Sequence, residues 1–276
     1  MLSDITIGQY YKADSLVHKL DARTKLLLTL WFIIIIFLCK NFLSLILVMA
    51  FVSFCVLMSK VPFKMFLKSL KPIIPIVLFT SVLNIFYIKD GNPLLSWNFI
   101  NITDKGIATA VFMSVRIVIL IVCSSLLTYT TVPTQLTDGI EKLLSPLKVF
   151  HIEVHTLAMM MTLALRFIPT LIEEIERITN AQKARGADLE NGKLTERVKA
   201  MVPILVPLFV SAFSRAYELA FAMSCRCYRG GQGRTRMKVM KMTFKDFAAF
   251  IVFSAITAGT VLLNIIFKSV IYGVII

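Results

Sequence analysis

The 276-residue sequence has few charged residues and an odd number of cysteines. Only 17% of its residues are charged, against about 25% in soluble domains, and 57% are hydrophobic. This balance argues against a soluble globular protein and for a membrane protein. Of the five cysteines, Cys39, Cys55 and Cys123 lie inside apolar runs, so we expect small buried side chains rather than a secreted disulfide framework. Residues 1–21 are polar and charged, so we expect no signal peptide.

Five apolar runs predict membrane-spanning helices, each of which needs roughly 20 mostly apolar residues. Lys40 and Asn41 separate the first two runs as a tight polar turn. The runs cover residues 26–39, 42–58, 72–88, 107–130 and 247–276. The sequence therefore predicts an all-α membrane protein with about five transmembrane helices.

The stretch between the fourth and fifth runs differs in composition and holds most of the charge. Apolar residues recur there at three- and four-residue steps over 151–186 and about 195–228, which predicts two long amphipathic helices. A shorter amphipathic helix is expected over 134–147, stopped near Pro146. We therefore divide the chain into an N-terminal segment with four spans (1–130), an inserted helical domain (131–242) and the last span (243–276).

Lysine and arginine are unevenly distributed among the loops. They are concentrated before the first span, between the second and third spans, and in the inserted domain. The positive-inside rule therefore predicts that the N-terminus and the inserted domain are cytoplasmic, with Ile276 outside. The net charge of +14 requires no nucleic acid, because anionic membrane lipids and an acidic cytoplasmic partner account for it equally well.

Four groups of residues occur in a characteristic order along this hydropathy profile. They are Gly8-Gln9-Tyr10 with Asp14, Ser15, His18 and Leu20–Lys25; Thr130–Pro133 with Leu136; Leu165–Pro169 with Glu173 and Gln182–Gly186; and Arg215-Ala216 with Ala222, Met223 and Arg226. Any one group alone is weak. Together they resemble the transmembrane T component of energy-coupling factor transporters, which take up vitamins and metal ions in prokaryotes.

The resemblance implies a non-enzymatic coupling subunit in the cell membrane, with the inserted domain as its coupling domain. In that family, two long helices each end in an Ala-Arg-Gly-type motif, and each arginine enters a groove on one of two ABC-type ATPase subunits. Here Ala184-Arg185-Gly186 matches the pattern, whereas Cys225-Arg226-Cys227 keeps only the arginine. The glycine missing from the second motif is expected at Gly230.

The same resemblance implies an interchangeable substrate-binding membrane subunit beside this chain. The chain itself would bind no cofactor, since ATP is bound by the partner ATPase subunits, and the substrate is not readable from this sequence. Long one-sided helices must bury their apolar faces on each other, on the bilayer or on a partner. We name Met160, Leu208 and Phe213 as candidates for docking the substrate-binding subunit, with packing between the two helices as the alternative.

The residue pattern by itself also allows simpler interpretations. Arg185 and Arg226 each end a stripe of polar and small residues, where an arginine could be no more than a helix cap. Arg116 lies in the middle of a predicted span, where a charge is costly. We favour a structural role, either a bond to backbone carbonyls near Pro72 or Pro75 or an extension of the side chain along a tilted helix.

Other site types are less well supported by the sequence. His151, Glu153 and His155 provide too few ligands for a metal site, so no metal is expected. A membrane-embedded lipid or isoprenoid transferase would need clustered acidic residues, and none stands out. A secondary transporter would need internal repeats, and we see no repeat.

Overall fold

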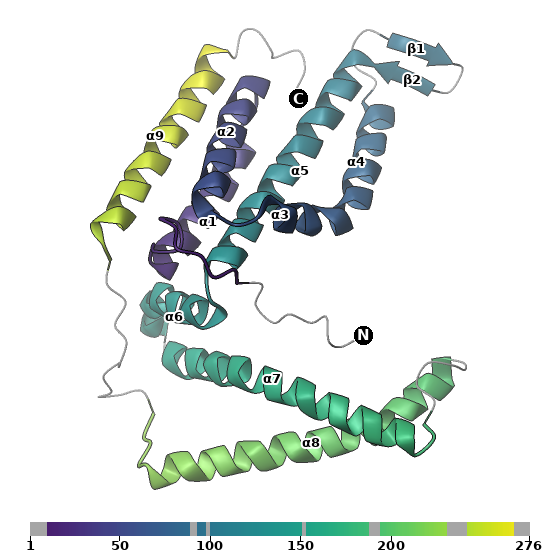
Figure 1. Ribbon diagram of the computed structural model, residues 1–276. Helices are drawn as coiled ribbons and strands as arrows, with labels where there is room; N and C mark the ends of the chain where they lie inside the picture. The colour runs from purple at the N-terminus through teal and green to yellow at the C-terminus, as the bar shows by residue number, and fades with distance from the viewer. Residues whose placement is uncertain are drawn as a thin grey trace. The chain divides into compact units, whose positions relative to one another are not determined.

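The computed structural model describes residues 10–88, 93–97, 100–150, 153–187, 194–230 and 242–267. Most of these residues lie in long helices (Figure 1). The helices are α1 (Ala22–Leu38), α2 (Phe42–Ser59), α3 (Phe63–Leu70), α4 (Ile74–Tyr87), α5 (Asp104–Thr130), α6 (Pro133–Leu143), α7 (Val154–Ala184), α8 (Leu194–Cys225) and α9 (Phe244–Ile266), with 3₁₀ turns η1 (Lys71–Ile73) and η2 (Ser145–Phe150). The prediction of a helical membrane protein is confirmed.

Within the described residues, six helical segments are long and apolar enough to cross a membrane. They are α2, the continuous α3–α4 segment, α5, α7, α8 and α9. This set differs from the predicted spans at two places. α1 has 17 residues and is shorter than the roughly 20 that a perpendicular span needs, whereas α7 and α8 qualify by length and composition. Their charge pattern, and not their length, is what distinguishes α7 and α8 from the predicted spans.

Local capping explains where several helices begin. The side chain of Asp21 accepts a hydrogen bond from the Arg23 backbone N–H at the start of α1. The Thr103 hydroxyl accepts one from the Gly106 backbone N–H at the start of α5. α9 begins with a capping box between Thr243 and Asp246. These side chains satisfy backbone N–H groups that have no partner within the helix.

The described residues separate into two compact units, one of residues 10–139 and 242–267 and the other of residues 140–230. The core of the first unit is formed mainly by α1, α2 and α5, and includes the fully buried side chains of Phe32, Ile35, Val48 and Phe112. In the same unit α9 packs against α1 and α2, while α3 and α4 pack against α5. The core therefore consists of interlocked aromatic and branched side chains from helices distant in sequence.

Arg116 closes the turn between α1 and α2. Its guanidinium donates a 2.5 Å hydrogen bond to the carbonyl of Cys39 and lies 4.7 Å from the centre of the Phe112 ring. Asn264 of α9 donates to the Leu38 carbonyl at 2.8 Å. The predicted role of Arg116 as a carbonyl donor is correct, but its predicted partner near Pro72 or Pro75 is wrong. The end of α1 leaves carbonyls without helical partners, and α5 and α9 supply the missing donors.

Two further details differ from the sequence predictions. The short strands β1 (Pro93–Trp97) and β2 (Ile100–Thr103) form an antiparallel hairpin before α5, where no strand was predicted. The predicted helix over 134–147 ends at Leu143, and η2 follows it. Pro146 explains the early end, because proline lacks the N–H that a continuing helix requires and disfavours helical geometry in the residue before it.

Candidate coupling site

Helices α7 and α8 of the second unit form an antiparallel pair. Three contacts join an early part of one helix to a late part of the other. The contacts are Tyr228 Oη to Met159 Sδ at 3.0 Å, Arg215 Nη2 to Glu174 Oε2 at 3.0 Å, and Gln182 Nε2 to the Pro203 carbonyl at 3.4 Å. Because the residue numbers rise along α7 as they fall along α8, the two helices run in opposite directions.

The end of α7 has the hydrogen bonds of a Schellman motif. Arg185 is the C-cap residue, and Gly186 follows with a positive φ of 88°. The Gly186 N–H donates to the Lys183 carbonyl and the Ala187 N–H to the Gln182 carbonyl, both at 3.0 Å. Glycine suits this position because it has no side chain that would clash in a left-handed backbone conformation.

The end of α8 repeats this geometry residue for residue. The Cys227 N–H donates to the Ser224 carbonyl at 2.9 Å, and the Tyr228 N–H donates to the Met223 carbonyl at 3.1 Å. Cys227 has a φ of 55°, so a cysteine occupies the left-handed position that glycine occupies after α7. The interpretation that Gly230 replaces the missing glycine is therefore wrong, although Gly230 also has a positive φ. Arg226 stands in the same place relative to its helix end as Arg185 does.

Both motifs are exposed and lie at opposite ends of the helix pair. Ala184, Arg185 and Gly186 are exposed residues, as are Cys225, Arg226 and Cys227. The contact between Tyr228 and Met159 places the end of α8 beside the start of α7. At a rise of 1.5 Å per residue, the two arginines are then separated by roughly 35 Å along the pair. The structure therefore brings the residues within each motif together and keeps the two motifs apart.

The polar stripes that lead to the two arginines meet between the helices. Glu174 lies on the α7 stripe that ends at Arg185, and Arg215 lies on the α8 stripe that ends at Arg226. Their ion pair is partly exposed, with 27% and 37% of the side chains accessible. Arg215 also donates to Ser211 of its own helix at 3.5 Å. The polar stripes thus fix the alignment of α7 against α8, in addition to leading to the two arginines.

The outer face of α8 is apolar and uncovered. Phe213 is 71% exposed, and the Phe209 and Phe213 rings stack with centroids 6.5 Å apart. Among the other residues proposed for docking, Met160 is 56% exposed and Leu208 is half-buried. Further exposed side chains follow at three- and four-residue spacing: Val198, Val202, Leu205, Phe209, Tyr217 and Phe221. Such a continuous apolar face is unusual unless lipid or another protein covers it.

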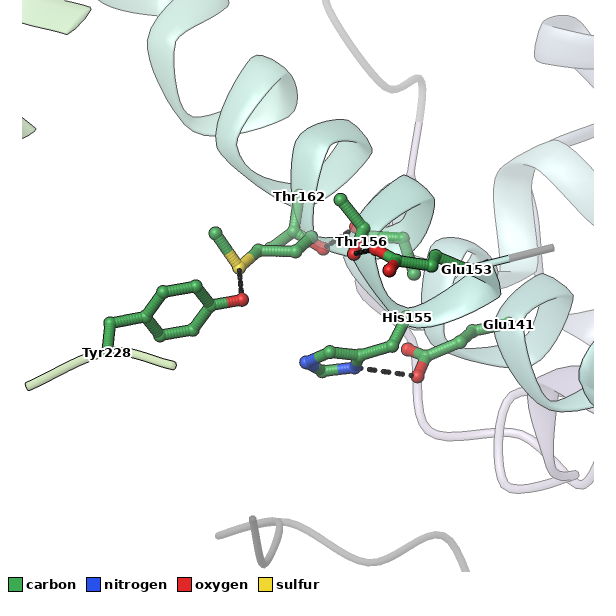
Figure 2. A network of polar contacts seen from close by, with 8 residues as sticks. Glu141, Glu153, His155, Thr156, Thr162 and Tyr228 are labelled. Carbon is green, nitrogen blue, oxygen red and sulfur yellow. Dashed lines mark hydrogen bonds and ion pairs between the residues drawn. The ribbon is translucent and has the colours of Figure 1, made fainter. Parts of the chain in front are cut away.

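Polar residues near the start of α7 pair with each other. Figure 2 shows His155 pointing toward Glu141, with Nδ1 and Oε1 3.2 Å apart, and Thr156 beside Glu153. The same view shows the Tyr228 hydroxyl directed at the Met159 sulfur. His151, the third residue of the metal alternative, lies outside the described residues. Within the described part of the chain, no group of three or more potential metal ligands was found.

A polar network in the first unit was not predicted from the sequence, where Lys25 is part of the N-terminal motif and of the positive charge before the first span but has no predicted contacts. The buried Lys25 ammonium donates to the Thr130 carbonyl at 2.8 Å and the His18 carbonyl at 3.1 Å. The buried Asp246 accepts from the backbone N–H of Asp21 at 2.9 Å. These contacts join the N-terminal segment to the end of α5 and the start of α9. The available signal was the position of Lys25 and Asp246, each of which directly precedes an apolar run.

The residues of the N-terminal motif form part of this network. The Tyr11 carbonyl accepts a 2.9 Å hydrogen bond from Nε2 of His18, so Nδ1 is the unprotonated nitrogen that accepts from the Ser15 hydroxyl at 2.7 Å. Burial lowers the pKa of His18 below its usual 6.5; the bond to Tyr11 opposes this shift, and the nearby Lys25 charge adds to it. His18 is therefore held as a neutral ring in the folded chain.

Comparison with known proteins gives one consistent result. Residues 13–238 match a family described as cobalt transport protein. The chain is 51% identical over 250 residues to the energy-coupling factor transporter transmembrane protein EcfT of Clostridium kluyveri, covering 90% of this chain and 93% of that protein. It is 46% identical over 246 residues to EcfT of Bacillus subtilis, covering 89% and 93%.

The fold and these matches define a polytopic membrane transport protein. More particularly, the chain belongs to the family of energy-coupling factor transporter transmembrane proteins, since the relatives match it over nearly their whole length. The resemblance noted in the sequence is thereby confirmed. The relatives are named as transporter components, and the alternative of a lipid or isoprenoid transferase finds no support among them.

Proposed function

We propose that this chain couples two ABC-type ATPase subunits to a substrate-binding membrane subunit, with Arg185 and Arg226 as the two points of attachment. The observation that carries the proposal is the repeated geometry of the two helix ends. Each end presents an exposed arginine one residue before a left-handed turn, at opposite ends of one antiparallel pair. Two equivalent sites far apart suit two similar partners that move relative to each other.

Arginine is suited to this role by its chemistry. Its planar guanidinium forms paired hydrogen bonds with carboxylates or backbone carbonyls, while its stem packs against apolar walls. A charge-assisted hydrogen bond of this type contributes about 1.5–3 kcal/mol. The two ends of the α7–α8 pair would thus be bound firmly by the ATPase subunits. The ion pair between Glu174 and Arg215 would keep the two helices moving as one body.

The membrane arrangement forms part of the same proposal. The coupling helices α7 and α8 would lie on the cytoplasmic side, because the positive charge of the chain gathers there and ATP is available there. The native Cys225 and Cys227 are exposed at the end of α8. In intact cells they should resist an impermeant thiol reagent, and a cysteine at exposed Asp104 in a Cys225→Ser, Cys227→Ser background should react. Labelling of the native pair from outside would overturn this orientation.

The apolar face of α8 would receive the substrate-binding subunit, through Phe213 and with Met160 of α7 as a further contact. Selection of the vitamin or other micronutrient would then belong to that subunit and not to this chain. One copy of this chain could serve several such subunits in turn, since exposed aromatic side chains together with exposed methionines such as Met160 and Met201 adapt to different partners. ATP would be bound only by the ATPase subunits.

The test is a set of arginine variants in the assembled transporter. Arg185→Ala and Arg226→Ala should each reduce uptake and stimulated ATP hydrolysis, and the double variant should nearly abolish both without affecting membrane insertion. Lysine should rescue poorly at either position, because its ammonium lacks the planar fork. Arg229→Ala, which removes an exposed arginine three residues beyond Arg226, is the matched control. A double variant that binds both ATPases and transports normally would reduce these arginines to helix caps.

A further inference from the structure

The first unit contains an apolar cavity of about 360 Å³. Its walls are formed by the N-terminal segment and by α1, α2, α5 and α9, and almost all of the lining side chains are hydrophobic. Cavities of roughly 300–1,000 Å³ are the usual size for a small-molecule site in proteins. The cavity lies within one compact unit and contains none of the residues of the coupling site.

The cavity extends from the ends of the helices along their apolar length. It is open on one side, because Leu16, Phe54 and Val252 of its lining are 53%, 56% and 48% exposed. On α9 its lining runs from Lys245 to Phe253, and on α5 it runs from Thr130 back to Cys123. At 1.5 Å per residue, both stretches are about 10–12 Å long. The inner end is formed by Phe51 and Phe253, whose rings meet edge to face with centroids 5.0 Å apart. The cavity is thus an elongated space with an apolar inner end.

The outer end of the cavity is cationic. Lys25 and Lys245 both line it, and Lys245 is exposed. The Lys25 ammonium binds two backbone carbonyls and has a third N–H to donate. The Asp246 and Asp21 carboxylates lie near Lys25 and oppose part of its charge, and Asp246 also accepts hydrogen bonds from the backbone of Asp21 and Thr243. Residues 10–25 and 242–246 together carry five lysine and arginine side chains against three aspartates.

The packing of α9 leaves one of its faces accessible to a ligand in the cavity. α9 packs against α1 and α2, and its residues Ala249 and Val252 line the cavity together with Leu126 of α5. Exposed apolar side chains in the lining gain dispersion contacts when an apolar ligand packs against them. A flexible hydrocarbon chain supplies such contacts without requiring a hydrogen bond from the walls.

We propose that this cavity binds one anionic phospholipid, with part of an acyl chain between α5 and α9 and the phosphate at Lys25 and Lys245. The shape and charge of the site match both parts of this ligand. The apolar inner end suits hydrocarbon, and the two ammonium groups at the outer end attract a phosphate as point charges. The bound lipid would complete the packing of α9 and tie it to the N-terminal network. The inference does not depend on the proposed attachment of the ATPases.

The experiment uses the full chain extracted from membranes in a mild detergent. Native mass spectrometry and lipid extraction should find about one phospholipid per chain. In exchange against mixed micelles, phosphatidylglycerol should be retained at least fivefold better than phosphatidylcholine. Ala249→Phe fills the cavity and should reduce retention at least tenfold. Ala255→Phe places the same side chain at an exposed position of the same helix and should retain the lipid as the unaltered chain does.

A second pair of variants tests the headgroup site without altering the interior. Lys245→Glu at an exposed position should abolish the preference for phosphatidylglycerol, whereas Lys64→Glu, exposed and outside this cavity, should not. Added phosphatidylglycerol should raise the melting temperature of the unaltered chain more than that of Lys245→Glu. The proposal is overturned if the unaltered chain retains no phospholipid, if Lys245→Glu keeps the full preference, or if the retained molecule is a free fatty acid or neutral lipid.

Discussion

Glu174 of α7 and Arg215 of α8 form a 3.0 Å ion pair between the two polar stripes that lead to Arg185 and Arg226. The two residues are 41 positions apart in sequence, yet they fix how the coupling helices align. This ion pair lies between two other polar contacts of the described residues, one near each end of the two helices: Gln182 to the Pro203 carbonyl and Tyr228 to Met159. Any relative sliding of the helices would have to break it.

This ion pair should contribute to coupling more than to stability. Because both side chains are partly exposed, Arg215→Ala should cost less than about 1 kcal/mol of unfolding free energy. The rate of coupled ATP hydrolysis should fall more clearly than the stability does, because α7 and α8 are no longer held in a fixed alignment. Exchanging the charges in the double variant Glu174→Arg, Arg215→Glu should restore part of the activity. Equal activity of Arg215→Ala and the unaltered chain, measured in the assembled transporter, would exclude this role.

Cys227 has a backbone conformation that favours glycine, so its replacement by glycine should stabilise the end of α8. A left-handed residue with a side chain costs roughly 1–2 kcal/mol relative to glycine. Cys227→Gly should therefore raise the melting temperature, and Cys227→Val should lower it. The converse substitution, Gly186→Ala, should be destabilising through the backbone alone, since no atom lies within 4 Å of the added carbon. A melting temperature that does not respond to any of these changes would contradict the assigned geometry.

Phe213 should be the most sensitive of the three docking candidates. A charge there would be buried without a partner when the substrate-binding subunit docks, which costs several kcal/mol. We expect Phe213→Glu, and to a smaller extent Met160→Glu, to reduce capture of that subunit while both ATPases remain bound. Phe150→Glu, at a 75% exposed phenylalanine outside α7 and α8, is the matched control. Leu208 is half-buried, so its charged variant should also weaken folding. Capture at the control level in both test variants would indicate that the face meets lipid instead.

His18 should make the folded chain less stable in mildly acidic solution. Its pKa is lowered in the folded state, so the unfolded chain binds more protons as the pH falls below 6.5. The contribution of His18 is then fully present above pH 6.5 and is lost as the pH falls through the folded-state pKa. Melting temperatures of the purified chain between pH 5 and 8 should show this decline, and His18→Gln should reduce its slope. An identical slope in the variant would assign the decline to other groups.

Much of this protein was predictable from local sequence. The apolar runs, the capping residues and the amphipathic periods are properties of neighbouring residues, so they predict where helices lie and which residues end them. The arginine motifs could be located for the same reason, because each is a short segment at the end of a periodic pattern. The left-handed backbone of Cys227 could not be predicted, because cysteine carries no sequence signal for that conformation.

Only the tertiary structure decided which distant groups meet. It assigns the Cys39 carbonyl to Arg116, the Thr130 carbonyl to Lys25, and Glu174 to Arg215. It also brings five segments together around one apolar cavity. Hydrophobic periodicity shows which face of a helix is buried but not which helix covers it, because burial is non-directional. Hydrogen bonds and ion pairs are directional, so their partners are determined only when the packed helices set the distances between them.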